Sequence, residues 1–125
     1  LFRSAVSDGN ALTESAIQPT VHAGSIEVPV TTLDVYCSRT GLKLSSRDLI
    51  KIDVEGADLS VLEGAARVIR EGRPQIAVTT YHEQRHAEQM LELLSGLVPE
   101  YRFRVKGLAF WMSPMRPVLL QAALP

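Results

Sequence analysis

The sequence has few of the features that mark several large classes of protein. It contains one cysteine, Cys37, which excludes a disulfide-stabilised scaffold. No apolar run approaches the roughly 20 residues that a membrane-spanning helix needs, so we expect no membrane partner. Its 13 Lys and Arg residues nearly balance 14 Asp and Glu residues. The strongly basic balance typical of nucleic-acid-binding proteins is therefore missing, and we expect no nucleic-acid partner.

The remaining composition is that of one ordinary globular domain. The chain has 125 residues, of which 46% are apolar and 22% are charged. A chain of this length and composition can form one hydrophobic core without disulfide bonds or structural metal ions. We therefore expect a single domain over residues 1–125, with an irregular part at 1–47 and a core at 48–125. No signal-peptide pattern is present, and we expect a cytoplasmic protein. The chain starts at Leu1, inside a run with strand character, which suggests that an upstream segment is missing.

The first 47 residues are weakly patterned. The segment 26–30 alternates like a strand. Thr31 or Thr32 can cap a short helix that ends near Gly41. We expect Cys37, on that helix, to be a small buried apolar residue rather than a nucleophile.

The rest of the chain alternates between strands and helices. Residues 48–54 form a β-branched apolar run typical of a buried parallel strand. Residues 57–71 form an amphipathic helix, with Asp58 in its first turn as the helix dipole favours. A second strand at 75–80 and a second helix at about 87–97 follow. This order predicts an α/β fold with a parallel sheet covered by helices.

Two further strands, at 101–110 and 118–124, end the sequence. The seven residues between them are too few for a parallel crossover, so these strands should form an antiparallel hairpin. The first of them alternates basic and apolar side chains. We interpret the charges as protection of an exposed edge strand; a phosphate-binding or nucleic-acid-binding strip is the alternative. The basic residues are Arg102, Arg104 and Lys106.

Polar residues follow both parallel strands at the point where each strand ends. Asp53 and Glu55 end the first strand, and His82 follows the second. Ligands of open α/β sheets bind beyond the carboxyl ends of parallel strands, so these side chains should converge in one crevice. Two carboxylates and an imidazole can act as general acids and bases or orient a hydroxyl group. We take them as candidate catalytic residues; in the alternative interpretation the acids only stabilise a helix N-terminus and His82 caps a loop.

The segment His82-Glu83-Gln84-Arg85-His86 matches the His-Glu-x-x-His pattern of zinc proteases. That chemistry needs both histidines one turn apart on the same helix. Since His82 directly follows a strand, we expect the two histidines not to share a helix. We therefore assign no metal site, and a zinc hydrolase is the least favoured alternative.

Three motifs occur together in the sequence. They are Ile26-Glu27-Val28-Pro29-Val30-Thr31-Thr32-Leu33-Asp34, Asp48-Leu49-Ile50-Lys51-Ile52-Asp53-Val54-Glu55-Gly56-Ala57 and Val61-Leu62-Glu63-Gly64-Ala65. Together they closely resemble the FkbM family of methyltransferases. Enzymes of this family are class I and S-adenosylmethionine-dependent, and they typically act on hydroxyl groups of sugars and natural products. The resemblance implies a Rossmann-like sheet of parallel strands, flanked by helices, that ends in an antiparallel β-hairpin.

The resemblance covers only the carboxyl-terminal half of such a domain. Class I enzymes hold the cofactor on a glycine-rich turn after their first strand, yet no Gly-x-Gly occurs among the eight glycines of this chain. The implied fold is a truncated class I sheet, and we expect the chain to be inactive alone. By resemblance, Ser7 and Asp8 lie near the adenine, while Asp53, Glu55 and Gly56 lie near the methyl donor and acceptor. We therefore take Ser7, Asp8 and Gly56 as candidate cofactor-binding residues.

The truncation predicts an unpaired sheet edge. In the class I strand order, the strand at 48–54 would lie beside the first strand, which has no counterpart here. An exposed apolar edge pairs with something, either residues 26–30, a swapped amino terminus or a second copy, and we predict a homodimer. Two functions remain open: a hydroxyl-directed methyltransferase, and a non-catalytic oligomerising module that keeps the fold.

Overall fold

The structure, a computed structural model, describes residues 30–125 of the chain. The opening run that starts at Leu1 and residues 26–29 of the strand predicted at 26–30 lie outside the described residues, as do Ser7 and Asp8. Val30 is described and is not in a strand. No helix in the described part is long and apolar enough to cross a membrane. In chain order the elements are α1 (Leu33–Thr40), β1 (Leu49–Ile52), α2 (Asp58–Glu63), α3 (Ala66–Gly72), β2 (Gln75–Thr79), α4 (His86–Leu97), β3 (Arg102–Ala109) and β4 (Arg116–Ala123).

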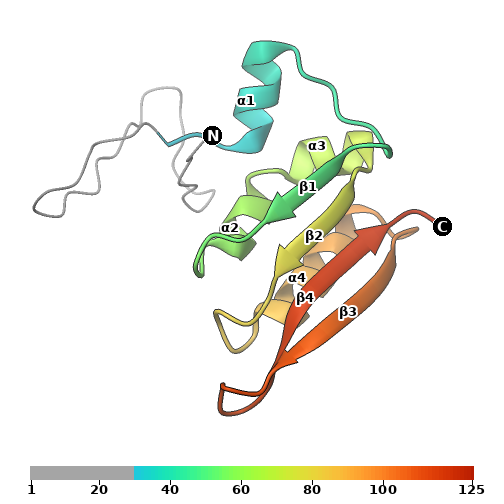
Figure 1. Cartoon of the computed structure of the whole chain (residues 1–125). Helices are drawn as coiled ribbons and strands as arrows, with labels where there is room; N and C mark the ends of the chain where they lie inside the picture. Colours follow the sequence, from blue (N-terminus) through green and yellow to red (C-terminus); the bar gives the residue numbers. More distant parts are fainter. Residues whose placement is uncertain (1–29) are drawn as a thin grey trace, which may run out of the picture.

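The four strands form one mixed sheet in the order β1-β2-β4-β3 (Figure 1). β1 and β2 pair in parallel, with Ile52 opposite Val78, and β4 runs antiparallel to both β2 and β3. The predicted parallel pair and terminal antiparallel hairpin are therefore confirmed. β3 is the edge strand, as predicted, and its basic side chains are exposed. They are Arg102, Arg104 and Lys106.

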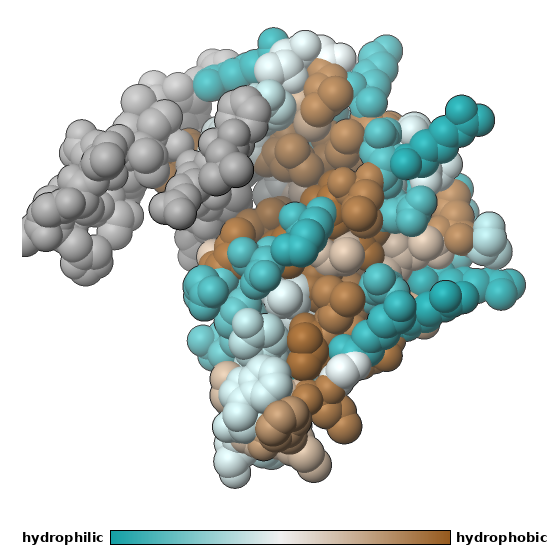
Figure 2. Space-filling view, in the orientation of Figure 1, coloured by the Kyte–Doolittle hydropathy of each residue, from teal (hydrophilic) through white to brown (hydrophobic). Residues whose placement is uncertain are grey.

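The helices α2, α3 and α4 cover one face of the sheet, behind the strands in Figure 1. The register places Ile52, Val78 and Leu120 side by side on that face, where they are at most 2% exposed. They pack against the fully buried helix residues Leu62 and Met90. Burial of each such side chain contributes about 1.5–3 kcal/mol, so this layer holds the strand ends in place. The opposite face shows mixed polar and apolar surface in Figure 2.

The helix predicted at 57–71 is interrupted, so the prediction of one continuous helix was wrong. The structure has two short helices, α2 and α3, separated at Gly64 and Ala65. The reason is a side chain from α1: the Asp34 carboxylate accepts hydrogen bonds from the backbone N–H groups of Arg67 and Val68, both at 2.9 Å. These donors at the start of α3 need no partner in a preceding helical turn.

The short helix α1 begins and ends as its sequence predicts. Thr32 caps it by accepting the N–H of Val35 at 3.2 Å, and Gly41 ends it in the left-handed conformation at φ 70°. Cys37 is 3% exposed. Burial raises the pKa of its thiol, although Arg67 lowers it in part. The prediction of a buried apolar cysteine is confirmed.

Candidate functional site

The loops that follow β1 and β2 bring the three candidate catalytic side chains together. Because these strands are parallel neighbours, their carboxyl ends lie at one edge of the sheet. One ligand atom each of Asp53, Glu55 and His82 lies within 4.8 Å of the other two. The distance between His82 Nε2 and a Glu55 carboxylate oxygen is 3.6 Å. The predicted convergence is therefore observed, while a catalytic role for these residues stays a prediction.

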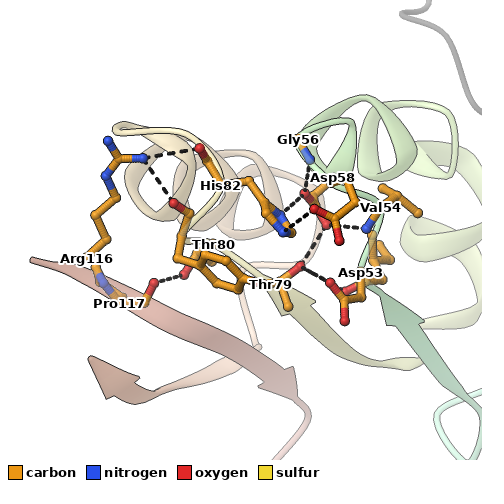
Figure 3. A network of polar contacts seen from close by, with 12 residues as sticks. Asp53, Val54, Gly56, Asp58, Thr79, Thr80, His82, Arg116 and Pro117 are labelled. Carbon is orange, nitrogen blue, oxygen red and sulfur yellow. Dashed lines mark hydrogen bonds and ion pairs between the residues drawn. The ribbon is translucent and has the colours of Figure 1, made fainter. Parts of the chain in front are cut away.

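A fourth side chain, Asp58, contacts His82 and the ends of both strands (Figure 3). It is fully buried, at 0% exposure. Its Oδ1 accepts from the N–H of Val54 at 3.0 Å and from the hydroxyl of Thr79 at 2.8 Å. Its Oδ2 accepts from the N–H of Gly56 at 3.1 Å and lies 2.8 Å from Nδ1 of His82. One carboxylate therefore joins the end of β1, the end of β2 and the His82 loop.

The hydrogen bonds keep Asp58 ionised despite its burial. Burial raises the pKa of Asp58, but the hydrogen bonds from Thr79, Val54, His82 and Gly56 outweigh it, and the pKa lies below its usual value. A carboxylate only accepts hydrogen bonds, so the geometry assigns the proton of the facing ring nitrogen to Nδ1. The lone pair of a neutral imidazole then lies on Nε2.

The Nε2 atom of His82 is buried and has no hydrogen-bond partner in the described part of the chain. The side chain as a whole is 9% exposed. A buried polar atom without a partner is rare in folded proteins and calls for an explanation. Here it faces Glu55, whose side chain is 89% exposed. The site thus contains one imidazole nitrogen in a fixed position beside the exposed carboxylates of Asp53 and Glu55.

The turn between β1 and α2 has a left-handed backbone. Glu55 has φ 54° and Gly56 has φ 102°. A side chain at position 56 would meet nothing closer than 3.9 Å, namely a Glu83 carboxylate oxygen, so the backbone angle rather than space requires glycine there. The N–H of Gly56 donates to Asp58. The cofactor-binding role of Gly56 stays a prediction, and in this conformation its N–H already has a partner.

The start of β4 holds the His82 loop from the other side (Figure 3). Arg116 Nη1 donates to the carbonyl oxygens of Tyr81 and His82 at 3.0 and 3.2 Å. The hydroxyl of Thr80 donates to the carbonyl of Pro117 at 2.7 Å. The sequence carries no signal for the role of Arg116, because its partners are backbone atoms more than 30 positions away. These contacts fix the loop that carries the imidazole.

Aromatic rings line the site on the side of the hairpin. The ring centroids of Tyr81 and His82 lie 4.2 Å apart. Trp111 packs edge-on against Tyr81, with 6.1 Å between the ring centroids. Burial raises the pKa of Tyr81, and the negative charge of Asp53 adds to the effect. Phe110 and Trp111 are 78% and 59% exposed. An exposed aromatic surface thus adjoins the charged cluster.

The His-Glu-x-x-His match does not form a zinc-protease site. His82 lies in the loop before α4, and His86 is the first residue of that helix. The two histidines therefore do not share a helix, which confirms the sequence prediction. The Nδ1 of His82 faces Asp58, and the group of possible metal ligands found in the described residues does not include His86.

Comparison with known proteins agrees with this architecture. The sequence matches the methyltransferase FkbM domain over residues 1–105, which defines the class of the protein as a methyltransferase-type α/β domain. The chain belongs to the FkbM methyltransferase family, and the resemblance of its three motifs is confirmed. No curated protein matches the chain.

A solved structure shows a similar fold. It is the crystal structure of methyltransferase FkbM from Methylobacillus flagellatus KT, with a TM-score of 0.57 and 25% sequence identity. The similarity covers 76% of this chain and 23% of that one. The aligned part of this chain therefore spans less than a quarter of that chain.

Proposed function

We propose that the chain forms the carboxyl-terminal half of the Rossmann-like sheet of an S-adenosylmethionine-dependent methyltransferase that acts on hydroxyl groups. Membership of the FkbM family supports the class of reaction. The observation that carries the proposal is the oriented Nε2 of His82, which is buried beside two carboxylates and has no hydrogen-bond partner in the described residues. It lies beyond the carboxyl ends of two parallel strands, where α/β sheets bind ligands.

The residues around this nitrogen suit the activation of a hydroxyl group. A hydroxyl oxygen that accepts a methyl group must lose its proton, and Nε2 of His82 has the lone pair that can take it. Asp58 then balances the charge of the imidazolium through its 2.8 Å contact to Nδ1. A positioned general base of this kind contributes about 10²–10⁴-fold to rate. Asp53 and Glu55 can accept hydrogen bonds from further hydroxyls of the acceptor.

The described residues lack the glycine-rich part of a class I cofactor site. S-adenosylmethionine supplies an electrophilic methyl group when it is bound. The described residues form no glycine-rich turn, and the sequence contains no Gly-x-Gly. Ser7 and Asp8, the other candidate cofactor contacts, lie outside the described residues. The proposal therefore includes inactivity of this chain by itself.

A chimera tests the proposal. The amino-terminal part of the Methylobacillus flagellatus FkbM domain is placed before this chain, and S-adenosylhomocysteine binding is measured by calorimetry. We expect binding by the chimera, none by the chain alone, and methyl transfer to hydroxyl acceptors that His82→Gln lowers by about 10²–10⁴-fold. Glu88→Gln, an exposed change on α4, is the matched control.

Two outcomes count against the proposal. A folded chimera that does not bind S-adenosylhomocysteine favours the non-catalytic interaction module, for which the missing Gly-x-Gly is the specific observation. Tight binding by the chain alone contradicts its proposed inactivity. Unchanged transfer in His82→Gln contradicts the assigned base.

A further inference from the structure

The cluster at the strand ends has the spacing of a chelating site. Ligand atoms of Asp53, Glu55 and His82 all lie within 4.8 Å of one another, and His82 Nε2 is 3.6 Å from a Glu55 carboxylate oxygen. Two ligands bound tetrahedrally at about 2.0–2.2 Å from one cation lie about 3.4 Å apart. Side chains of Asp53 and Glu55 are 42% and 89% exposed, so small rotations complete the approach.

The histidine is an independent sign of a ligand. Its side chain is nine-tenths buried and its Nε2 points into the cluster without a hydrogen-bond partner in the described residues. A neutral imidazole with a free nitrogen is a common metal ligand. A carboxylate behind the other ring nitrogen, as Asp58 stands 2.8 Å from Nδ1, is the arrangement that orients metal-bound histidines in proteins.

We propose that Asp53, Glu55 and His82 bind one divalent transition-metal cation, such as Mn²⁺ or Zn²⁺. One imidazole nitrogen with two carboxylates suits these ions, whereas Ca²⁺ prefers six to eight oxygen ligands. Three protein ligands also leave a coordination position open for water or a bound oxygen. The sequence predicts no metal site here, because the His-Glu-x-x-His pattern requires two histidines on one helix and His82 directly follows a strand.

A protein cation already lies near the cluster. Lys51 Nζ is 3.6 Å from a carboxylate oxygen of Asp53, and its side chain is 67% exposed. Exposed ion pairs of this kind contribute about 0–1 kcal/mol, so a divalent ion displaces the ammonium at little cost. Lys51→Met is therefore expected to strengthen metal binding.

The catalytic meaning of the metal rests on the proposed function, but its binding does not. In a metal-bound form, Nε2 of His82 would be a ligand and not the general base, and the cation would promote loss of the acceptor's proton by coordinating the hydroxyl oxygen. Binding itself depends only on the three described side chains. The two proposals can therefore fail separately.

Calorimetric titration of Mn²⁺ and of Zn²⁺ into the full 125-residue chain tests the site, with loss of the free Mn²⁺ signal in electron paramagnetic resonance as a second readout. We expect one ion per chain. Asp53→Asn and Glu55→Gln should each weaken binding about tenfold or more, while Glu88→Gln binds as the unmodified chain does. Circular dichroism verifies that each variant is folded.

The exposed carboxylates carry this test, because replacement of the buried His82 also perturbs folding. Absence of saturable binding of both ions, or unchanged affinity in Asp53→Asn and Glu55→Gln, overturns the metal site. Binding of S-adenosylhomocysteine by the chimera with no metal binding overturns this inference alone. Metal binding without S-adenosylhomocysteine binding by the chimera overturns the proposed function alone.

Discussion

Asp58 shows how one buried charge organises this protein at the scale of a residue. Its carboxylate has four hydrogen-bond partners, two from backbone amides and two from side chains. Asp53, five positions earlier, has a partly exposed side chain with one contact to Thr79 at 3.3 Å and one to Lys51. Asp53, in the loop after β1, and Asp58, at the start of α2, thus contribute very differently to the structure.

Asp58→Ala is expected to destabilise the fold by more than about 3 kcal/mol, because each buried donor left without a partner costs about 1–3 kcal/mol. Asp53→Ala is the matched control, with an expected loss below about 1 kcal/mol. Urea denaturation followed by circular dichroism measures both. Equal midpoints for the two variants would show that the network around Asp58 contributes little to stability.

Because the pKa of Tyr101 is raised, we expect the protein to lose stability at alkaline pH. Burial raises its pKa to about 12, although Arg73 lowers it in part, and the hydroxyl donates to the carbonyl of Pro74. The unfolded chain therefore loses this proton near pH 10, before the folded chain does. Its stabilising effect is complete below pH 10 and is lost as the pH rises towards 12.

Comparison with Tyr101→Phe isolates this titration. At pH 8 the variant should be less stable by about 1 kcal/mol, through the lost hydrogen bond. Above pH 10 the difference should shrink by up to about 1.4 kcal/mol per pH unit. The free energy of unfolding is measured between pH 8 and 11.5. A constant difference over this range contradicts the assignment.

At the scale of elements, Asp34 joins α1 to the start of α3. Its carboxylate accepts the backbone N–H groups of Arg67 and Val68, and the Arg67 guanidinium returns a hydrogen bond to the Asp34 carbonyl at 2.7 Å. The residue before α3, Ala65, provides no side-chain cap. Asp34 therefore caps a helix that lies more than 30 positions away in the sequence.

Asp34→Ala should cost about 1–2 kcal/mol, the usual range for a lost helix cap. Asp34→Asn should retain part of this stability, since an amide oxygen can still accept one N–H. Glu71→Ala is the control, because within residues 30–125 that carboxylate makes one exposed ion pair, with Arg67. Denaturation midpoints that do not separate Asp34→Ala from Glu71→Ala would contradict the capping role.

Periodicity and turn residues were enough to predict the parallel pair β1–β2, the hairpin β3–β4 and the ends of α1, since each depends on neighbouring residues. The break between α2 and α3 could not be predicted, because the interrupting carboxylate of Asp34 comes from α1. Strand ends also predicted that Asp53, Glu55 and His82 meet. The role of Asp58 was missed, because its partners Thr79 and His82 are 21 and 24 positions away.

At the scale of the whole molecule, the edge of β1 that faces away from β2 is a candidate interface. β1 pairs with β2 and with no other strand among residues 30–125, and Leu49 is 63% exposed. The predicted homodimer would cover this edge, as exposed apolar edges favour pairing. In the described part of the chain, the helices α2, α3 and α4 lie against one face of the sheet (Figure 1).

Sedimentation equilibrium checks this prediction. We expect a dimer whose fraction rises with concentration, and Leu49→Lys should shift the chain towards the monomer, because a charge on an edge strand opposes pairing. Val105→Lys, on the opposite edge strand β3 where Val105 is 52% exposed, is the control and should leave the dimer intact. A monomer at high concentration would contradict the proposed interface.

The hydrogen bonds of Asp58 should also slow hydrogen exchange in the loop after β1. The amides of Val54 and Gly56 belong to no helix or strand, yet both donate to a carboxylate that is itself tied to β2. Their hydrogens should exchange with solvent water as slowly as those of the central strands, since release requires opening of the same cooperative unit. The turn that bears Glu55 is, on the timescale of hydrogen exchange, a part of the sheet.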